Sequence, residues 1–157
     1  MVALQTPVAV ALSCLLTSVS AAGTFNLLTY NVAGLPAWLS DNGIPGDKAV
    51  NAARVGKLLG EKAHDFVHLQ EDFAYNKEIY GADTVHPHRT DTKGNVPFGD
   101  GLNTLANYPW TAGLTRKKWD KCWIVEADCL TPKGFSFMRA ALDGAEVDLY
   151  NLHADAG

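Results

Sequence analysis

The chain has 157 residues, of which 47% are hydrophobic and 19% charged, a composition that fits one globular domain and excludes a disordered chain. Its formal net charge of −4 lies outside the basic range in which proteins hold polyanions by neutralising phosphates. Non-specific binding of nucleic acid is therefore not favoured, although a local basic groove would be compatible with this charge.

The first 22 residues contain no Asp, Glu, Lys or Arg. Their apolar stretch, Val8 to Leu16, is too short to span a membrane and is followed by a run of small residues, Ser18 to Ala22. We interpret residues 1–22 as a secretory signal peptide that is removed within or after that run, which predicts a secreted protein without a transmembrane segment. The alternative, an N-terminal core helix, is less favoured because the segment has neither a cap nor a polar face.

Cleavage there would remove Cys14 and leave two cysteines, Cys122 and Cys129, in a chain that passes through an oxidising compartment. We expect these two to form a disulfide that closes a short loop. Two unrelated buried thiols are the alternative. A zinc site would need more ligands nearby than this pair provides.

The first half of the chain predicts a strand, a helix and a second strand. Residues Thr24 to Val32 are rich in strand formers. Asp47 stands at the N-cap position of an amphipathic pattern from Lys48 to Lys62, which predicts a helix. The apolar run Phe66 to Gln70 is too short for another helix, so it predicts a buried strand that delivers Glu71 at its end.

The second half predicts a short helix near Lys77 to Tyr80, then a surface loop up to Gly99, and then a meander of four strands. The last two strands are joined across Asp143-Gly144. The four predicted strands are Leu102–Asn107, Thr111–Lys117, Gly134–Leu142 and Glu146–Leu152. This order predicts a layered α/β or α+β domain in which helices cover the outer face of a sheet.

Polar side chains that can bind metals or transfer protons follow three of the predicted strands. They lie in the segments Tyr30–Gly34, Leu69–Asp72 and Tyr150–Asp155. Neighbouring strand ends meet at one edge of a sheet, so an amide, a carboxylate and an imidazole delivered in this way can share a cleft.

From Phe25 to its last residue the chain resembles the endonuclease/exonuclease/phosphatase superfamily, which includes pancreatic-type deoxyribonuclease, neutral sphingomyelinases and inositol-polyphosphate phosphatases. Four segments, in this order and spacing, carry the resemblance: Thr29–Val32, Gln70-Glu71, Gly99–Pro109 and Asn151–His153. Each alone would occur by chance in unrelated proteins.

The resemblance implies a two-layer β-sandwich flanked by helices, of which residues 23–157 would form the N-terminal part. It implies Glu71 as the principal ligand of Mg²⁺, with Mn²⁺ or Ca²⁺ as alternatives, and Asn31 beside it; a hard divalent ion prefers such oxygen ligands. His153 resembles an active-site histidine that contacts the phosphoryl group or assists the leaving oxygen. The family's second histidine and its downstream Gly-Asp-x-Asn and Ser-Asp-His segments are not in the sequence.

Three further residues resemble positions that bind substrate in this family: Asp100, Asn107 and Lys133. For Asp100 an Asx-turn in a loop is equally favoured, and for Lys133 a solvated position in a turn. Without the ordered pattern, Asn31, Glu71 and His153 would also have ordinary structural interpretations as a strand cap, a surface acid and a partly buried histidine.

Two other groups of residues have weaker functional interpretations. A transition-metal site is less favoured than unconnected loop histidines for His64, His68, His86 and His88. A base-stacking platform is less favoured than packing in the core and in turns for Trp38, Trp110, Trp119 and Trp123, because no run of basic residues accompanies them.

The sequence therefore predicts an exported, divalent-metal-dependent phosphodiesterase or phosphatase in which water attacks phosphorus without a covalent enzyme intermediate. The expected substrate is a small-molecule, lipid or nucleotide phosphoester, with nucleic acid less favoured; Leu35-Pro36 and Trp38 near the first site loop favour a lipid or small phosphoester. The alternative is a non-catalytic truncated fragment or binding module that keeps the cleft but lacks the downstream catalytic residues.

Overall fold

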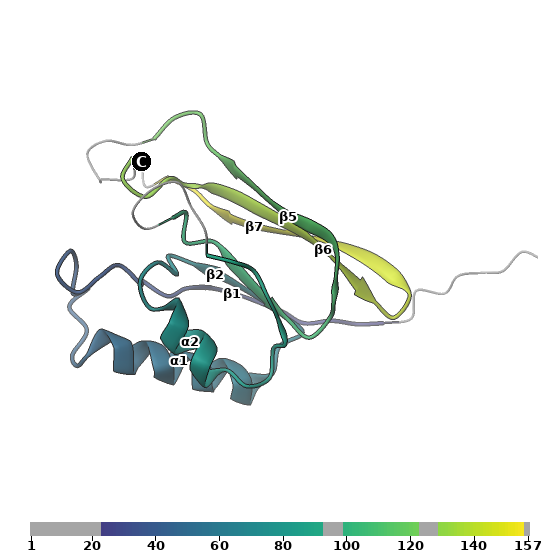
Figure 1. Ribbon diagram of the computed structural model, residues 1–157, viewed down its shortest axis with the longest axis horizontal. Helices are drawn as coiled ribbons and strands as arrows, with labels where there is room; N and C mark the ends of the chain where they lie inside the picture. The colour runs from purple at the N-terminus through teal and green to yellow at the C-terminus, as the bar shows by residue number, and fades with distance from the viewer. Residues whose placement is uncertain (1–22, 93–98, 123–128, 156–157) are drawn as a thin grey trace, which may run out of the picture.

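A computed structural model describes residues 23–92, 99–122 and 129–155 (Figure 1). The predicted signal peptide and Trp123 lie outside these residues. In the described part of the chain, no helix has the length and apolar character needed to cross a membrane.

The first sheet contains four strands in the order β1-β2-β4-β3. β1 (Leu27–Asn31) runs parallel to β2 (Phe66–Gln70), so both strands end at the same edge. β4 (Asn103–Ala106) is antiparallel to β2 and also pairs with the two-residue strand β3 (His88–Arg89). The start of β4, rather than its end, therefore lies beside the end of β2.

The second sheet is an antiparallel meander of β5 (Trp110–Lys118), β6 (Gly134–Leu142) and β7 (Ala145–His153). The turn Asp143-Gly144 joins β6 to β7, as predicted, and both of its residues have positive φ. The prediction of a four-strand meander was wrong, because β4 belongs to the first sheet. The chain passes from one sheet to the other at Asn107–Pro109, where proline cannot continue a ladder.

Two helices cover the first sheet on the face opposite the second sheet (Figure 1). α1 (Lys48–Lys62) begins where the sequence predicted, because the Asp47 carboxylate accepts a hydrogen bond from the Val50 amide at 2.9 Å. α2 (Asn76–Ala82) is slightly longer than predicted. The core between helices and sheet contains Leu59, Val67, Leu69, Ile79 and Leu105.

β2 is the central strand, and all five of its residues are buried. Its side chains alternate, as in any strand, so Val67 and Leu69 face the helices while Phe66 faces the second sheet. Phe66 packs there with Ala106, Ala140 and Leu149. The protein is thus a mixed α/β structure of two packed sheets and one helical layer.

The segment predicted as surface loop after α2 is partly structured and buried. Arg89 lies in β3, and the ring of His86 is fully buried, with Nδ1 2.8 Å from an Asp83 carboxylate oxygen and Nε2 2.7 Å from the carbonyl oxygen of His64. A two-residue strand and one buried imidazole produce no periodic pattern, so the sequence did not predict them.

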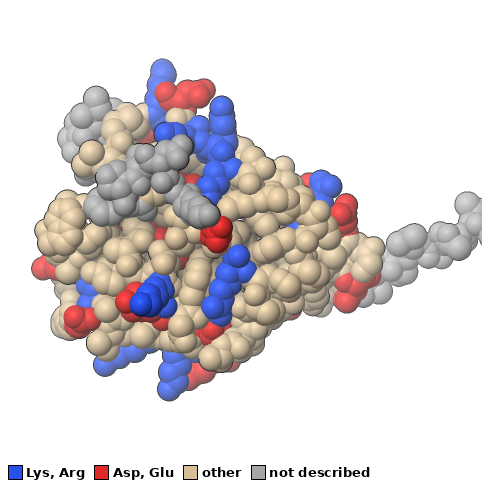
Figure 2. Space-filling view, viewed as in Figure 1, with Lys and Arg blue, Asp and Glu red and all other residues tan. Residues whose placement is uncertain are grey.

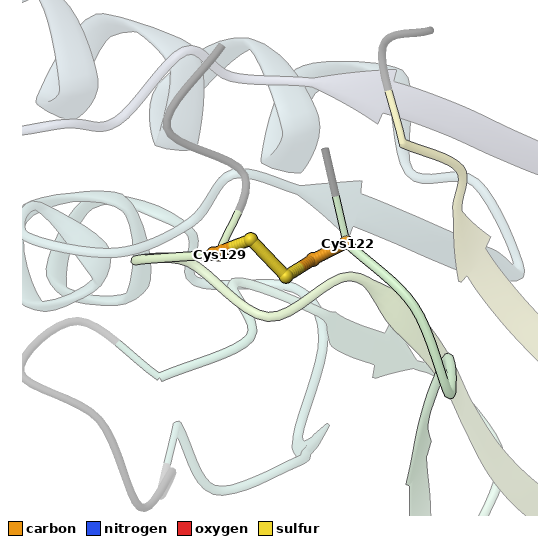
Figure 3. The surroundings of a disulfide bond; sticks show 2 residues. All are labelled: Cys122 and Cys129. Carbon is orange, nitrogen blue, oxygen red and sulfur yellow. A yellow bond between two sulfur atoms is a disulfide. The ribbon is translucent and has the colours of Figure 1, made fainter. Parts of the chain in front are cut away.

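Cys122 and Cys129 are joined by a disulfide, as predicted, with their Cα atoms 5.1 Å apart (Figure 3). The bond links the segment that follows β5 to the segment that precedes β6. It therefore closes the base of the connection between these two strands.

Replacing both cysteines with serine should lower the free energy of unfolding by about 2–3 kcal/mol, because the cross-link removes loop-closure entropy from the unfolded chain over a short loop. Urea unfolding of the Cys122→Ser/Cys129→Ser variant measures this difference. The control is the same comparison in the presence of a reductant, where the two proteins should be equally stable. Equal stability of the double variant and the parent would contradict a stabilising role for the bond.

Candidate active site

Three predicted site residues converge at the edge where β1 and β2 end and β7 crosses them. The Asn31 side-chain nitrogen donates a hydrogen bond to Glu71 Oε1 at 2.9 Å, and His153 Nε2 lies 3.7 Å from the same oxygen. Glu71 and His153 are mostly buried, with side chains 23% and 17% exposed. An amide, a carboxylate and an imidazole from three strands therefore share one partly open site.

The backbone of Glu71 is held in an unusual conformation between two glycines. Its φ of 55° lies in the left-handed region, which costs a non-glycine residue roughly 1–3 kcal/mol and is found preferentially at functional sites. A Cβ at Gly34 would lie 2.5 Å from the Glu71 carbonyl oxygen, and one at Gly101 would lie 2.9 Å from the Glu71 Cα. Both neighbouring loops can approach Glu71 only because these residues have no side chain.

Asn31 orients the carboxylate of Glu71. Its side-chain oxygen accepts the Ala33 backbone N–H at 2.9 Å, which fixes the amide so that its nitrogen faces Glu71. The Asn31 oxygen thus already has a backbone donor. This leaves the Glu71 carboxylate as the stronger candidate ligand for a divalent ion.

The donor chemistry fits Mg²⁺, which is commonly bound through one or two carboxylates while substrate phosphate and water fill the other positions. The Glu71 carboxylate is partly open to solvent. Asn31 donates a hydrogen bond to it and so orients it, as residues next to metal ligands commonly do. In the described ranges, no three His, Cys, Asp or Glu side chains gather as a metal cluster.

Asp100 and Lys133 lie near the same edge but have structural contacts. An Asp100 carboxylate oxygen forms an ion pair with Arg116 and accepts the Leu102 N–H at 3.0 Å, the Asx-turn that the sequence also allowed. Lys133 is buried rather than solvated, being 8% exposed, and it immediately precedes Gly134, which pairs with His153 in the β6–β7 register.

The structure does not bring Asn107 to the site. Asn107 follows the end of β4, at the opposite edge of the sheet, where its side chain donates to the His64 carbonyl at 3.3 Å. The buried amide near Glu71 is instead Asn103, at the start of β4, which donates to an Asp72 carboxylate oxygen at 2.7 Å. The prediction of Asn107 as a cleft residue is corrected by the strand direction.

Asp72 lies behind the site and is 1% exposed. Burial raises its pKa to about 6, and the hydrogen bond from Asn103 opposes that rise. Its Oδ1 has no hydrogen-bond partner within the described residues.

Asp72 also borders a cavity of about 350 Å³. The cavity lies between the end of β1, the loop that follows β1, and α1, and Asn31 and Lys48 line it as well.

Each histidine of the proposed transition-metal group has contacts of its own. His64 contacts Asn26, His68 contacts Thr104 and His86 contacts Asp83, while the His88 ring stacks edge-on to Trp110.

The tryptophans within the described residues have different surroundings. Trp110 packs against the inter-sheet core as predicted. Trp119 donates its ring N–H to the His153 carbonyl oxygen at 2.8 Å, so it supports the end of β7. Trp38 is 78% exposed and lies in a turn of the loop after β1, so it belongs to the turns rather than to the core.

Charges on the face shown in Figure 2 alternate in sign: Lys and Arg lie among Asp and Glu rather than in one basic band. This distribution agrees with the net charge of −4. It gives that face no continuous path for a polyanion.

Comparison with known proteins identifies what this geometry resembles. No family profile matches the sequence. The chain is 37% identical over 143 residues to a sphingomyelinase of Mycobacterium tuberculosis, an alignment that covers 86% of this chain and 28% of the relative. The chain therefore spans less than a third of the length of this relative.

Solved structures share the fold at lower identity. Sphingomyelinase C from Streptomyces griseocarneus superposes with a TM-score of 0.66 at 23% identity, over 83% of this chain and 49% of that one. An endonuclease/exonuclease/phosphatase family protein from Leptotrichia buccalis gives 0.57 at 14% identity, over 84% and 55%. Over about half of each of these two structures, the chain shares their fold. Beta toxin from Staphylococcus aureus, crystallised with bound magnesium ions, gives 0.66 at 19% identity, over 83% of this chain and 49% of the toxin.

The sequence analysis did not predict several residues near the site as site residues. Arg116 was not assigned to the site, and Gln70, Asp72, Asn103 and Asn151 were noted only as parts of motifs. A correct assignment of β4 to the first sheet would have found Asn103, because an antiparallel neighbour of β2 begins beside Glu71.

His68 makes the strand that carries Glu71 sensitive to acid. Burial lowers its pKa from 6.5 to about 4, so the folded state binds fewer protons than the unfolded state between these values. Stability is therefore fully present above pH 6.5 and is lost as the pH falls toward 4. Relative to a non-titrating variant, the loss at pH 4.5 should be about 2–3 kcal/mol.

Urea unfolding of the parent and of His68→Gln at pH 7 and pH 4.5 tests this. Glutamine can keep a polar contact with Thr104 but does not titrate, so the stability gap between the two proteins should shift in favour of the variant at the lower pH. A gap that does not change with pH would contradict a buried, neutral His68.

Proposed function

We propose that this chain carries the Glu71–Asn31–His153 part of the active site of a secreted, divalent-metal-dependent phosphodiesterase. The observation that carries the proposal is the convergence of Glu71 and His153, which are far apart in sequence, at 3.7 Å on one open edge of the fold. The similarity to a sphingomyelinase supports phosphodiester hydrolysis as the reaction.

Each of the three residues has a distinct role in the proposed reaction. Glu71 binds the divalent ion, and Asn31 holds its carboxylate in place through the 2.9 Å hydrogen bond. His153 donates a hydrogen bond to the phosphoryl group or a proton to the leaving oxygen. When bound, the ion withdraws charge from a phosphoryl oxygen and offsets the negative charge that grows in the transition state. A water oxygen bonds to phosphorus and releases a proton, the ester phosphorus–oxygen bond breaks, and the leaving oxygen takes up a proton.

The substrate we propose is a lipid phosphodiester such as sphingomyelin. The loop that follows β1 exposes three large apolar side chains next to the site: Trp38, Leu39 and Ile44, at 78%, 44% and 62%. Exposed apolar groups of this kind fit contact with a lipid surface better than contact with a nucleic-acid backbone. The mixed charges of the face in Figure 2 agree with this preference.

Secretion is proposed on two grounds. The sequence of residues 1–22 fits the pattern of a signal peptide, and the Cys122–Cys129 disulfide fits an oxidising compartment.

The test is release of phosphocholine from sphingomyelin vesicles by the purified chain, with Mg²⁺ and with EDTA. EDTA and Glu71→Gln should each reduce turnover at least 100-fold, because both remove the bound ion. Glu61→Gln is the matched control: this exposed residue of α1 forms an ion pair with Lys57, and turnover should be unchanged.

Turnover that survives both EDTA and Glu71→Gln would refute the metal mechanism. A parent chain without turnover would favour the alternative function, a non-catalytic binding module that keeps the cleft.

A further inference from the structure

Two buried amide side chains join the two sheets directly behind the site. Gln70 on β2 donates its side-chain N–H to Asn151 Oδ1 on β7 at 2.7 Å. The Asn151 nitrogen donates to two backbone carbonyl oxygens of the first sheet, those of Leu69 at 2.8 Å and Asn103 at 3.0 Å. Asn151 is 1% exposed, so these contacts are shielded from water.

This arrangement fixes the lateral position of one sheet on the other. Apolar contacts such as those of Phe66 and Leu149 favour stacking of the sheets but are not directional, so they tolerate a small slide. Buried amides cannot slide, because a donor or acceptor left unpaired costs about 1–3 kcal/mol. Asn151 meets the first sheet at three atoms, so it specifies one offset.

The pair is connected to the site through the chain itself. Glu71 directly follows Gln70, and His153 stands two residues after Asn151, on the same face of β7. A shift of β7 relative to β2 would therefore move His153 relative to Glu71 by a similar distance.

The hydrogen bond from Trp119 at the end of β7 lies within the second sheet. Trp119 donates to the His153 carbonyl oxygen, but Trp119 directly follows β5, which belongs to the same sheet as β7. It holds the strand end within the second sheet and leaves the offset between the sheets undetermined.

We propose that Asn151, together with Gln70, is the positioning pair that sets His153 against Glu71. The expected effect on turnover rests on the proposed function. The expected effect on the position of His153 relative to Glu71 rests on the geometry alone.

The structural content is tested first, in the chain itself, by the nuclear Overhauser effect between the His153 ring protons and the Glu71 side-chain protons. The effect should be present in the parent, lost in Asn151→Ala and kept in Val147→Ala. Val147 is the matched control, since it lies on the same strand and packs in the inter-sheet core without touching the amide pair.

A second variant and a rescue make the result decisive. Gln70→Ala removes the same side-chain link but leaves Asn151 bonded to both carbonyls, so it serves if Asn151→Ala does not fold. The exchange Gln70→Asn/Asn151→Gln keeps the combined length of the two side chains and should restore part of the signal. An undiminished effect in whichever of the alanine variants folds would overturn the proposal.

The rate of phosphocholine release from sphingomyelin vesicles provides the second readout. Misplacing His153 should lower kcat about 10- to 100-fold and leave KM and the affinity for Mg²⁺ within about threefold of the parent, because Glu71 is untouched. A loss of Mg²⁺ affinity equal to the loss of kcat would assign the pair to folding instead and would overturn the proposal. If the parent has no turnover, the proposed function fails, while the Overhauser measurement still decides whether the pair positions His153.

Discussion

The site depends on one backbone conformation, the left-handed turn at Glu71. This turn ends β2 and directs the carboxylate to the edge of the sheet, and it exists because Gly34 and Gly101 let two loops approach the Glu71 backbone. Both loops are bonded to it: the Gly34 N–H donates to the Glu71 carbonyl at 2.9 Å, and the Asp72 N–H donates to the Gly101 carbonyl at 3.0 Å. The strain is thus localised at the residue with the clearest chemical role, as expected where surrounding structure over-determines a conformation.

Apolar and polar contacts have different roles in the packing of the layers. The apolar cores on either face of the first sheet set the order of the layers, α1 and α2 on one side and the second sheet on the other. Polar contacts then select one arrangement: Gln70 bonds to Asn151 between the two sheets, and Asn103 bonds to Asp72 beside the end of β2 in the first sheet. Buried polar groups contribute less to net stability than to uniqueness, since each must find its partner. The packing of the layers therefore places a carboxylate and an imidazole from distant parts of the chain at one edge of the first sheet.

The sequence predicted the elements with local signals and missed those defined by tertiary contacts. The Asp47 cap and apolar period of α1, the apolar run of β2 and the Asp143-Gly144 turn were all predictable, because each is a property of neighbouring residues. The placement of β4 in the first sheet was not predictable, because the residue pattern of one strand does not determine which strand it pairs with. The ordered motifs identified Asn31, Glu71 and His153, while the hydrogen bond that makes Asn31 an orienting residue became visible only in the structure.

The central claim is that Glu71, Asn31 and His153 form one site around a divalent ion. Titration with paramagnetic Mn²⁺, followed by nuclear magnetic resonance of the chain, tests it most directly, because broadening falls steeply with distance from the ion. The account predicts that signals of Glu71, Asn31 and His153 disappear at low Mn²⁺ occupancy, that those of Asn107 at the far edge of the sheet persist, and that excess Mg²⁺ reverses the effect. Broadening centred elsewhere, or equal broadening at Asn107 and Glu71, would contradict it.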